Sequence, residues 1–449
     1  MASTIQVFRT AKNTPDRLAL KAPLAFHEET CEAPGIRVDA GKCFQTIEGF
    51  GGAFTEASAH TYYKMNPEKR AEILKAYFDP VTGIGFSLCR THINSCDFSL
   101  GNYAYTEVPG DVELKHFSIE HDRRQMIPMM KEAAAIAGQP IRLLATPWSP
   151  PAWMKTNGQM NHGGHLKPEY RQAWANYFVR YIQEYEKEGL TIWGVSVQNE
   201  PQAVQTWDSC IYDSAEERDF VRDYLGPTLK AAGMSERVKL LIWDHNRDLL
   251  YERAQAVYDD PAAAQYVWGA AFHWYTGDHF ENVQLTHDAF PGKHLLFSEG
   301  SAEGGLHMDP WKVGERYGQS MLQDLNHWTA GWIDWNLLLD VRGGPNHVGN
   351  YCSAPIIADY ARGTVNYQIS YYYIGQITKF VQPGAVRVVS ASGLDALETA
   401  AFRNPDGTVA VIVMNRTDGG CEFPLKVGGR IAMTDSPAHS MTTYCFAGK

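Results

Sequence analysis

The sequence lacks any apolar run long enough to cross a bilayer. Its first residues, MASTIQVFRTAKNTPDRLA, also lack the apolar core of a secretory signal. These two absences predict a cytoplasmic protein with no transmembrane segment, or a secreted protein whose signal was removed ahead of this sequence.

Positive charge is scarce and scattered. The 449 residues carry a formal net charge of −11, and no cluster of lysines and arginines occurs. A surface that binds phosphates needs such a cluster, so we expect no nucleic-acid partner. The acidic balance favours solubility and a neutral or cationic substrate, and nothing in the sequence specifies an oligomeric state.

Cysteine pairs with metal-ligand spacing are absent as well. The eight cysteines show no CxxC motif, so we interpret them as reduced thiols, with separate buried positions for Cys31, Cys89, Cys96, Cys210 and Cys352. There is no P-loop, no GxGxxG after a strand, no GxSxG and no HExxH, so no cofactor or metal is expected. His162 and His165 of NHGGH lack a carboxylate at matching spacing, which favours a glycine loop over a metal site.

Apolar strands alternate regularly with helical periodicity from residue 45 to about 335. The patterns predict helices over 66–78, 118–137, 168–187, 214–232, 247–258 and 311–327, with Ser214 and Glu217 as a capping box. They predict eight strands, over 45–54, 84–88, 141–145, 191–197, 238–243, 267–272, 295–297 and 331–335. This repetition is typical of an α/β fold, a (β/α)8 TIM barrel with insertions.

The pattern changes after Lys379. Short alternating segments such as AVRVVSASG and TVAVIVMNR, joined by turn residues, predict a side antiparallel β-sandwich over 380–449. Residues 1–44 contain short apolar patches that would add edge strands to that domain. The predicted organisation is therefore an N-terminal segment over 1–44, a catalytic barrel over 45–379 and a sandwich over 380–449.

The stretch TIWGVSVQNEP, residues 191–201, gives the strongest indication of function in the sequence. A buried strand ends at the polar residues before Pro201, so Glu200 lies at its carboxyl end with Asn199 just before it. In a parallel barrel, chemistry takes place at that end, where partial burial raises the pKa of a carboxyl. A second apolar strand, HLLFSE, ends in the same way at Glu299.

Polar and aromatic residues recur where the other strands end. Two carboxyls flanked by aromatics are what glycoside hydrolysis requires, because one protonates the leaving oxygen while the other attacks or activates water. Aromatic faces bind sugar rings, and Asp and Arg side chains hold hydroxyls. The candidates are Arg90, Asp97, Thr146, Trp148, Asn199, Glu200, Asp244, His273, Trp274, Tyr275, Glu299, Trp335 and Asn336.

Long motifs in a fixed order resemble glycoside hydrolase family 30, and within it the glucosylceramidase branch. They are TPWSPPAWMKTNG, VSVQNEP, FHWY, LLFSEG and DWNLLLDVRGGPNHVGN, and the likeness runs from about Gly49 to the C-terminus. The resemblance implies a (β/α)8 barrel, a side β-sandwich built from both chain ends, and retention of anomeric configuration.

Carried over by motif, the resemblance implies Glu200 as the acid/base and Glu299 as the nucleophile. It implies a sugar site lined by Arg90, Asp97, Trp148, Asn199, Tyr275 and Trp335. We further expect Arg90 to approach Glu299 and keep it ionised while Glu200 holds a proton. The loop PNHVGNY, with His347, Gly349 and Tyr351, departs from the family's pattern; we expect it to border the aglycone side.

The expected activity is hydrolysis of terminal β-glucosides, glucosylceramide among them, with a carbohydrate or glycolipid as the substrate. A β-xylosidase or a β-1,6-glucanase of the same family is an alternative. A non-catalytic carbohydrate-binding protein is disfavoured, because both glutamates are present.

Overall fold

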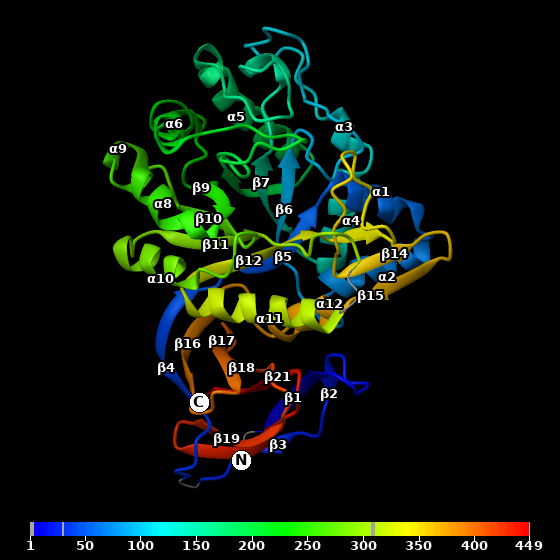
Figure 1. Cartoon of the computed structure of the whole chain (residues 1–449), viewed down its shortest axis with the longest axis vertical. Coiled ribbons are helices and arrows are strands. Elements are labelled where there is room, and N and C mark those ends of the chain that lie inside the picture. Colours follow the sequence, from blue (N-terminus) through cyan, green and yellow to red (C-terminus); the bar gives the residue numbers. More distant parts are fainter. Residues whose placement is uncertain (1–3, 29–30, 307–309, 449) are drawn as a thin grey trace.

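The computed structural model describes residues 4–28, 31–306 and 310–448. A barrel and a β-sandwich form its two bodies, and helices α11 (Pro310–Asn326) and α12 (Ile369–Thr378) lie between them (Figure 1). Within the described residues, no helix combines the length and the apolar character needed to span a membrane.

The predicted barrel is confirmed. Eight parallel strands of the described chain close on one another in the order β5 (Gly49–Phe54), β6 (Leu88–Ile93), β7 (Arg142–Pro147), β8 (Thr191–Ser196), β9 (Lys239–Asn246), β10 (Gly269–His273), β11 (His294–Glu299) and β12 (Thr329–Asn336). Their inward side chains fill the barrel with an apolar layer made of Leu88, Leu144, Trp193, Leu241, Ala271, Leu296 and Ile333.

Closure between β5 and β6 requires a glycine. A Cβ on Gly51 would lie 1.9 Å from the carbonyl oxygen of Leu88, so any side chain there would push the two strands apart.

Helices surround the barrel. They are α1 (Glu56–Lys64), α2 (Pro67–Phe78), α3 (Glu120–Arg123), α4 (Met126–Ala137), α5 (Arg171–Lys187), α6 (Ser214–Phe220), α7 (Gly226–Ala231), α8 (Leu250–Tyr258), α9 (Pro261–Ala264) and α10 (Phe280–Ala289). Single 3-10 turns occur at η1 (Ala152–Met154), η2 (Pro168–Tyr170) and η4 (Arg247–Leu249), and a π-helical turn at η3 (Val221–Leu225).

Two predicted helices are broken, and proline accounts for both breaks. The helix expected over 118–137 is split into α3 and α4, so that Pro128 falls in the first turn of α4, where its missing N–H costs nothing. The helix expected over 214–232 widens into η3 just before Pro227. Its capping box was also assigned wrongly: Asp213 is the N-cap, and its partner is Glu216.

The strand predicted over 84–88 was placed too early. Residues 84–87 are a connection in which Ile84 N–H donates to Ala76 O and Phe86 N–H to Tyr77 O, at 2.9 Å each. The strand β6 starts at Leu88, so Arg90 lies in mid-strand and not at its carboxyl end.

The C-terminal segment forms the predicted sandwich with strands from the N-terminus, and its strands pair antiparallel except that Ile36–Thr46 and Cys421–Val427 are parallel. The sheet runs β2 (Ala19–Leu20), β1 (Thr4–Ala11), β21 (Ser440–Ala447), β18 (Thr408–Asn415), β17 (Leu397–Arg403), β16 (Val386–Ser392), β4 (Ile36–Thr46), β19 (Cys421–Val427) and β20 (Arg430–Ser436), with β3 (Leu24–Ala25) beside β1. The expectation of edge strands was wrong for β1 and β4, which lie inside the sheet.

A small sheet lies beside the barrel. It consists of β13 (Leu338–Asp340), β14 (Ile356–Asp359) and β15 (Thr364–Tyr367), and the connection from β13 to β14 contains the PNHVGNY loop. All eight cysteines belong to the described residues and are free thiols, as expected from their spacing. Four of the five expected buried positions are buried, whereas Cys31 is only partly buried.

Candidate active site

Glu200 is held in place at the end of β8 by hydrogen bonds to both neighbouring strands. Asn199 N–H donates to Pro147 O at 2.8 Å, and Glu200 N–H donates to Asp244 O at 3.0 Å. These bonds hold Glu200 at φ 46°, a left-handed conformation that is unfavourable for a residue with a side chain. Strain of this kind is found at functional sites, where surrounding contacts fix one conformation.

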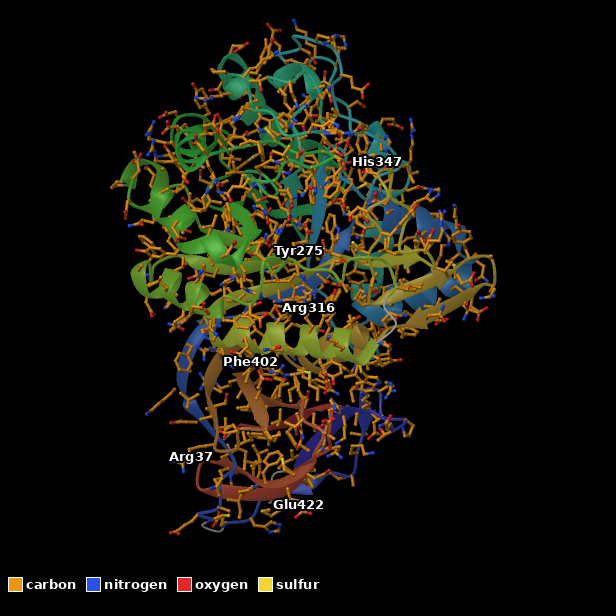
Figure 2. All side chains as sticks on the ribbon, viewed as in Figure 1. Arg37, Tyr275, Arg316, His347, Phe402 and Glu422 are labelled. Atoms are coloured by element: carbon orange, nitrogen blue, oxygen red, sulfur yellow. The ribbon has the colours of Figure 1, made fainter. Side chains whose placement is uncertain are left out.

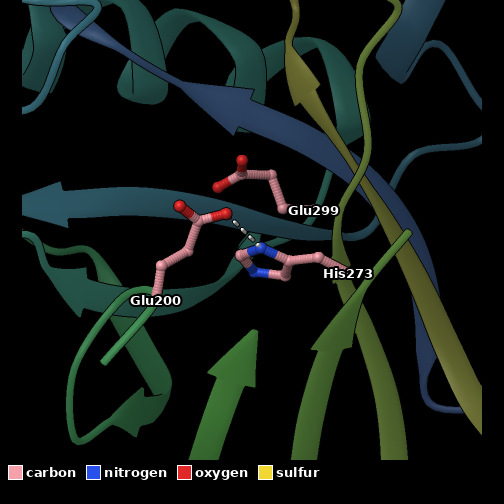
Figure 3. A group of neighbouring side chains, drawn as sticks. All are labelled: Glu200, His273 and Glu299. Carbon is pink, nitrogen blue, oxygen red and sulfur yellow. Dashed lines mark hydrogen bonds and ion pairs between the residues drawn. The ribbon is translucent and has the colours of Figure 1, made fainter. Parts of the chain in front are cut away.

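Glu299 ends β11 and faces Glu200 across the mouth of the barrel (Figure 3). One carboxylate oxygen of each glutamate and one ring nitrogen of His273 all lie within 4.8 Å of one another. Tyr275 Oη donates to Glu299 Oε1 at 2.9 Å, and Arg90 Nη1 donates to Glu299 Oε2. The two carboxylates can therefore approach the same bond of a substrate.

Arg90 supports the site from below. Its side chain is fully buried, and Nη2 donates to Asn199 Oδ1 and to Asp244 Oδ2, each at 2.9 Å. The guanidinium lies 4.7 Å from the ring centre of Trp148. The expected approach of Arg90 to Glu299 is found, and the same cation also neutralises Asp244, whose pKa is held well below its usual range.

A pocket of about 150 Å3 opens over the two glutamates. Seven of the eight sequence-predicted site residues line it, while Arg90 lies beneath: Asp97, Trp148, Asn199, Glu200, Tyr275, Glu299 and Trp335. Trp148 and Trp335 stack on each other, with ring centres 5.1 Å apart. The pocket combines aromatic surface with hydrogen-bonding groups, the combination that a sugar ring requires.

The two glutamates differ in pKa, as expected for a close pair, but in the opposite order. Burial would raise the pKa of Glu200, but the charges of His245 and His273 and the His273 hydrogen bond lower it to about 2. For Glu299, burial outweighs the charges of His273 and Arg90, so its pKa is raised. The expectation of a protonated Glu200 is wrong for the unliganded site, and the expected order of the two pKa values is reversed.

His245 and His273 together cause this reversal, and His273 also forms a hydrogen bond with Glu200. His273 Nδ1 lies 3.2 Å from Glu200 Oε1, and its Nε2 lies 3.1 Å from Asp244 Oδ1. Burial disfavours its charged form, but Glu299, Asp244 and Glu200 together raise the pKa of His273 to about 9. Burial lowers the pKa of His245, the other ring beside Glu200, so His273 carries the positive charge at neutral pH. A proton therefore lies one hydrogen bond away from Glu200.

Asp97 lies in the loop after β6 and is buried in the pocket wall. Asn350 Nδ2, from the PNHVGNY loop, donates to its Oδ2 at 3.0 Å. Burial and the charge of Glu299 raise the pKa of Asp97 to about 8, so near neutrality its carboxyl both donates and accepts hydrogen bonds. The loop that we expected on the aglycone side thus contacts a predicted sugar-binding residue.

Some pocket residues were not predicted from the sequence. They are Gln205, Trp207, His245, Asn246, Glu303, Asn350 and Cys352. His245 and Asn246 directly follow Asp244 at the end of β9, so the strand-end rule could have found them. The others lie in long connections that have no local signal.

Besides Arg90 and His273, four predicted strand-end residues lie outside the pocket lining. Thr146 and Asp244 are hydrogen-bonded below it, through Thr146 Oγ1 to Asp244 Oδ2 at 3.2 Å. Trp274 donates to Ser301 O, and Asn336 accepts from Thr55. The hydrogen bonds of these four side chains connect neighbouring segments at this end of the barrel.

Metal-ligand chemistry among the described residues is confined to this site. Glu200, His273 and Glu299 form the one group of three such side chains found there. The guanidinium of Arg90 already binds Glu299, which disfavours a further cation. In the NHGGH loop, His165 Nδ1 pairs with Glu216 Oε2 at 3.0 Å.

Two facing carboxylates over a sugar-sized pocket, at the carboxyl end of a (β/α)8 barrel, define a glycoside hydrolase. The Glycosyl hydrolase family 30 TIM-barrel domain matches residues 47–381, and the Glycosyl hydrolase family 30 beta sandwich domain matches residues 384–444. The chain belongs to glycoside hydrolase family 30.

Relatives with different substrates lie within this family. The lysosomal acid glucosylceramidase of Mus musculus is 37% identical over 425 residues, covering 90% of this chain and 81% of that protein. An endo-1,6-beta-D-glucanase of Neurospora crassa is 30% identical over 395 residues, covering 83% of this chain and 79% of that protein.

Two solved structures share both domains. The crystal structure of SrfJ from Salmonella typhimurium superimposes with a TM-score of 0.95 at 36% identity, covering 99% of this chain and 100% of that one. The endo-beta1,6-glucanase BT3312 gives a TM-score of 0.91 at 31% identity, covering 99% of each chain.

Proposed function

We propose that this glycoside hydrolase is a retaining β-glycosidase that removes terminal β-linked glucose by a double displacement. The observation that carries the proposal is the approach of Glu200 and Glu299 to within 4.8 Å. Retaining enzymes hold their carboxyls about 5–5.5 Å apart, whereas inverting enzymes need roughly 6.5–9.5 Å to admit a water molecule.

In the first step, Glu299 attacks the anomeric carbon and forms a glycosyl ester while the bond to the leaving oxygen breaks. Glu299 must be ionised for this attack, and Arg90 and Tyr275 stabilise its carboxylate by hydrogen bonds. The leaving oxygen takes a proton from Glu200. Since Glu200 is ionised in the unliganded site, we propose that His273 Nδ1 first transfers its proton to Glu200 Oε1 across 3.2 Å.

In the second step, the ionised Glu200 removes a proton from water, and the water oxygen attacks the anomeric carbon. The ester bond to Glu299 breaks, and the sugar leaves in its original β configuration. Glu200 then returns this proton to His273 Nδ1, so both carboxyls and His273 regain their starting protonation states.

The pocket, at about 150 Å3, is small for a ligand site, which favours a single terminal sugar over a longer chain. Glucosylceramide and related β-glucosides are the proposed substrates, supported by the murine glucosylceramidase relative. The second candidate is a β-1,6-glucanase, supported by the Neurospora crassa relative and by the similarity to BT3312.

One substrate panel tests the proposal. Nitrophenyl β-glucoside, nitrophenyl β-xyloside, β-1,6-linked gluco-oligosaccharides and glucosylceramide in detergent are each incubated with the enzyme and with the Glu299→Gln variant. We expect release of glucose from the nitrophenyl glucoside and the lipid by the unaltered enzyme alone, with β-glucose appearing first by NMR. Internal cleavage of the oligosaccharides would favour the glucanase, and α-glucose as first product would overturn the retaining mechanism.

A further inference from the structure

The loop between β13 and β14 is braced internally by one amide side chain. Asn346 Oδ1 accepts from Val348 N–H at 3.0 Å and from Asn350 N–H at 3.1 Å, while Asn346 Nδ2 donates to Asn350 O at 3.1 Å. These bonds join Asn346 to Val348 and Asn350. Because Asn350 is the residue that donates to Asp97, anything that positions this loop also positions Asp97.

His347 attaches this braced loop to the rest of the barrel end. Its imidazole is 11% exposed, and Figure 2 shows His347 in the barrel part of the molecule, away from the β-sandwich. Nδ1 lies 3.1 Å from Ser99 O, and a ring N–H there donates to this carbonyl, two residues beyond Asp97 in the same loop. The PNHVGNY loop thus contacts the Asp97 loop at two points: Asn350 binds the side chain of Asp97, and His347 binds the backbone carbonyl of Ser99.

The other ring nitrogen of His347 faces Asp208. His347 Nε2 lies 3.7 Å from Asp208 Oδ2, and neither atom has a hydrogen-bond partner among the described residues. Asp208 is fully buried, and its second oxygen accepts from Ser95 Oγ at 2.5 Å and from Asn102 Nδ2 at 2.9 Å. The imidazole is therefore the group that this carboxylate oxygen faces.

We infer that His347 is a positioning residue of the sugar pocket: it joins the PNHVGNY loop to Ser99 and Asp208 and so holds Asn350 on Asp97. The inference rests on the proposed function, and it takes Asp97, which lines the pocket, as the expected contact for sugar hydroxyls. His347 lies outside the pocket lining and touches no reacting atom, so its effect reaches the substrate through Asn350 and Asp97.

Two conservative substitutions separate the two contacts of the ring. In His347→Asn, the amide nitrogen replaces Nδ1 and keeps the bond to Ser99 O but loses the approach to Asp208. In His347→Gln, the longer side chain reaches toward Asp208 but loses the bond to Ser99. His116→Gln, an exposed histidine in the connection after β6, is the matched control.

The experiment measures kcat and KM for nitrophenyl β-glucoside, with the thermal midpoint of each variant as a check on folding. We expect both His347 variants to lower kcat/KM by about 10-fold, mainly by raising KM, because the contact to the sugar exists before and during the reaction. We expect His116→Gln to match the unaltered enzyme.

A double-mutant cycle tests the route through Asn350. Because His347 is proposed to act through that residue, adding His347→Gln to Asn350→Ala should lower kcat/KM no further than Asn350→Ala alone. If the fold-losses in kcat/KM of the two single variants multiply in the double variant, the inference is overturned. A loss of activity that is fully explained by unfolded protein would also overturn it. An unaltered enzyme without activity on any β-glycoside would instead refute the proposed function.

Discussion

At the scale of single residues, removing the charge of Glu200 and removing that of Glu299 should affect different steps of turnover. Glu299→Gln should lower turnover of every substrate by more than about 1,000-fold, because no other group in the pocket is placed to form the glycosyl ester. Glu200→Gln should still form the ester from a dinitrophenyl glucoside, whose leaving group needs no proton, and should then release the sugar slowly.

Azide distinguishes these roles. It needs no general base, so it should accelerate the Glu200→Gln variant and yield the β-glucosyl azide, while Glu299→Gln should not respond. The product is identified by NMR, and the unaltered enzyme without azide is the control. An α-glucosyl azide from Glu200→Gln, or azide rescue of Glu299→Gln, would contradict the assignment.

His273 predicts a pH dependence with two limbs. Below the raised pKa of Glu299, the nucleophile is protonated and kcat/KM falls as the pH falls. Above about pH 9, His273 loses its proton and Glu200 is left ionised with no proton to donate, so kcat/KM falls as the pH rises. The profile should be bell-shaped.

Replacing His273 should narrow this profile. In His273→Gln the positive charge is gone, so the pKa of Glu299 rises further and the acid limb of the profile shifts to higher pH. The loss of the proton source shifts the alkaline limb to lower pH. His245→Gln is the matched control: burial lowers the pKa of His245, so this ring is already neutral at the pH where His273 loses its proton, and the alkaline limb should stay in place. An unchanged profile in His273→Gln would exclude the proton transfer.

At the scale of elements, the start of α6 offers a direct comparison of two adjacent residues. The sequence favoured Ser214 as the cap, but Asp213 Oδ1 accepts from Glu216 N–H at 2.7 Å, and Glu216 Oε2 accepts from Asp213 N–H at 2.9 Å. Asp213→Ala should therefore lower the free energy of unfolding by about 1 kcal/mol. Ser214→Ala should change it by less than about 0.5 kcal/mol. Urea unfolding measures both, and equal effects would contradict the assigned cap.

The strands and the order of the barrel could be predicted because each strand is an apolar run separated by turn residues or a helix. The start of a strand could not be predicted in the same way. Nothing local distinguishes residues 84–87 from a strand, and only their hydrogen bonds to α2 make them a connection. That is why Arg90 was placed at a strand end, although it lies in mid-strand beneath the pocket.

The site was predictable where function follows from position on a strand. Glu299 ends β11 and Glu200 follows the end of β8, and they meet because parallel strands of a closed barrel share one rim. Their pKa order was not predictable, because it depends on the contact between His273 of β10 and Glu200 after β8. A distance across the barrel is not encoded in any local pattern.

At the scale of the whole molecule, both ends of the chain complete one sandwich. β1 lies between β2 and β21, and β4 lies between β16 and β19, so the first and last strands are hydrogen-bonded within a single sheet. The barrel lies between them in sequence. The sandwich sheet therefore cannot be completed until nearly the whole chain is present.

α12 joins this sandwich to the barrel through a buried amide. Gln376 Nε2 donates to Thr10 Oγ1 of β1 at 3.0 Å, and Thr443 Oγ1 of β21 donates to Gln376 Oε1 at 2.7 Å. On the barrel side of the same helix, Thr378 Oγ1 donates to Ile84 O at 2.7 Å. Because α12 binds both bodies through buried hydrogen bonds, they should unfold together in one transition.

Gln376→Leu tests this coupling. The leucine has a similar volume but leaves two buried threonine hydroxyls without their amide partner, which should lower the free energy of unfolding by about 1–3 kcal/mol. The weakened contact should also let the sandwich unfold before the barrel, visible as two transitions by calorimetry. Gln382→Leu, at an exposed position just beyond the same helix, is the control and should unfold as the unaltered protein does. A single transition at unchanged temperature in Gln376→Leu would show that the two bodies are held together by apolar packing alone.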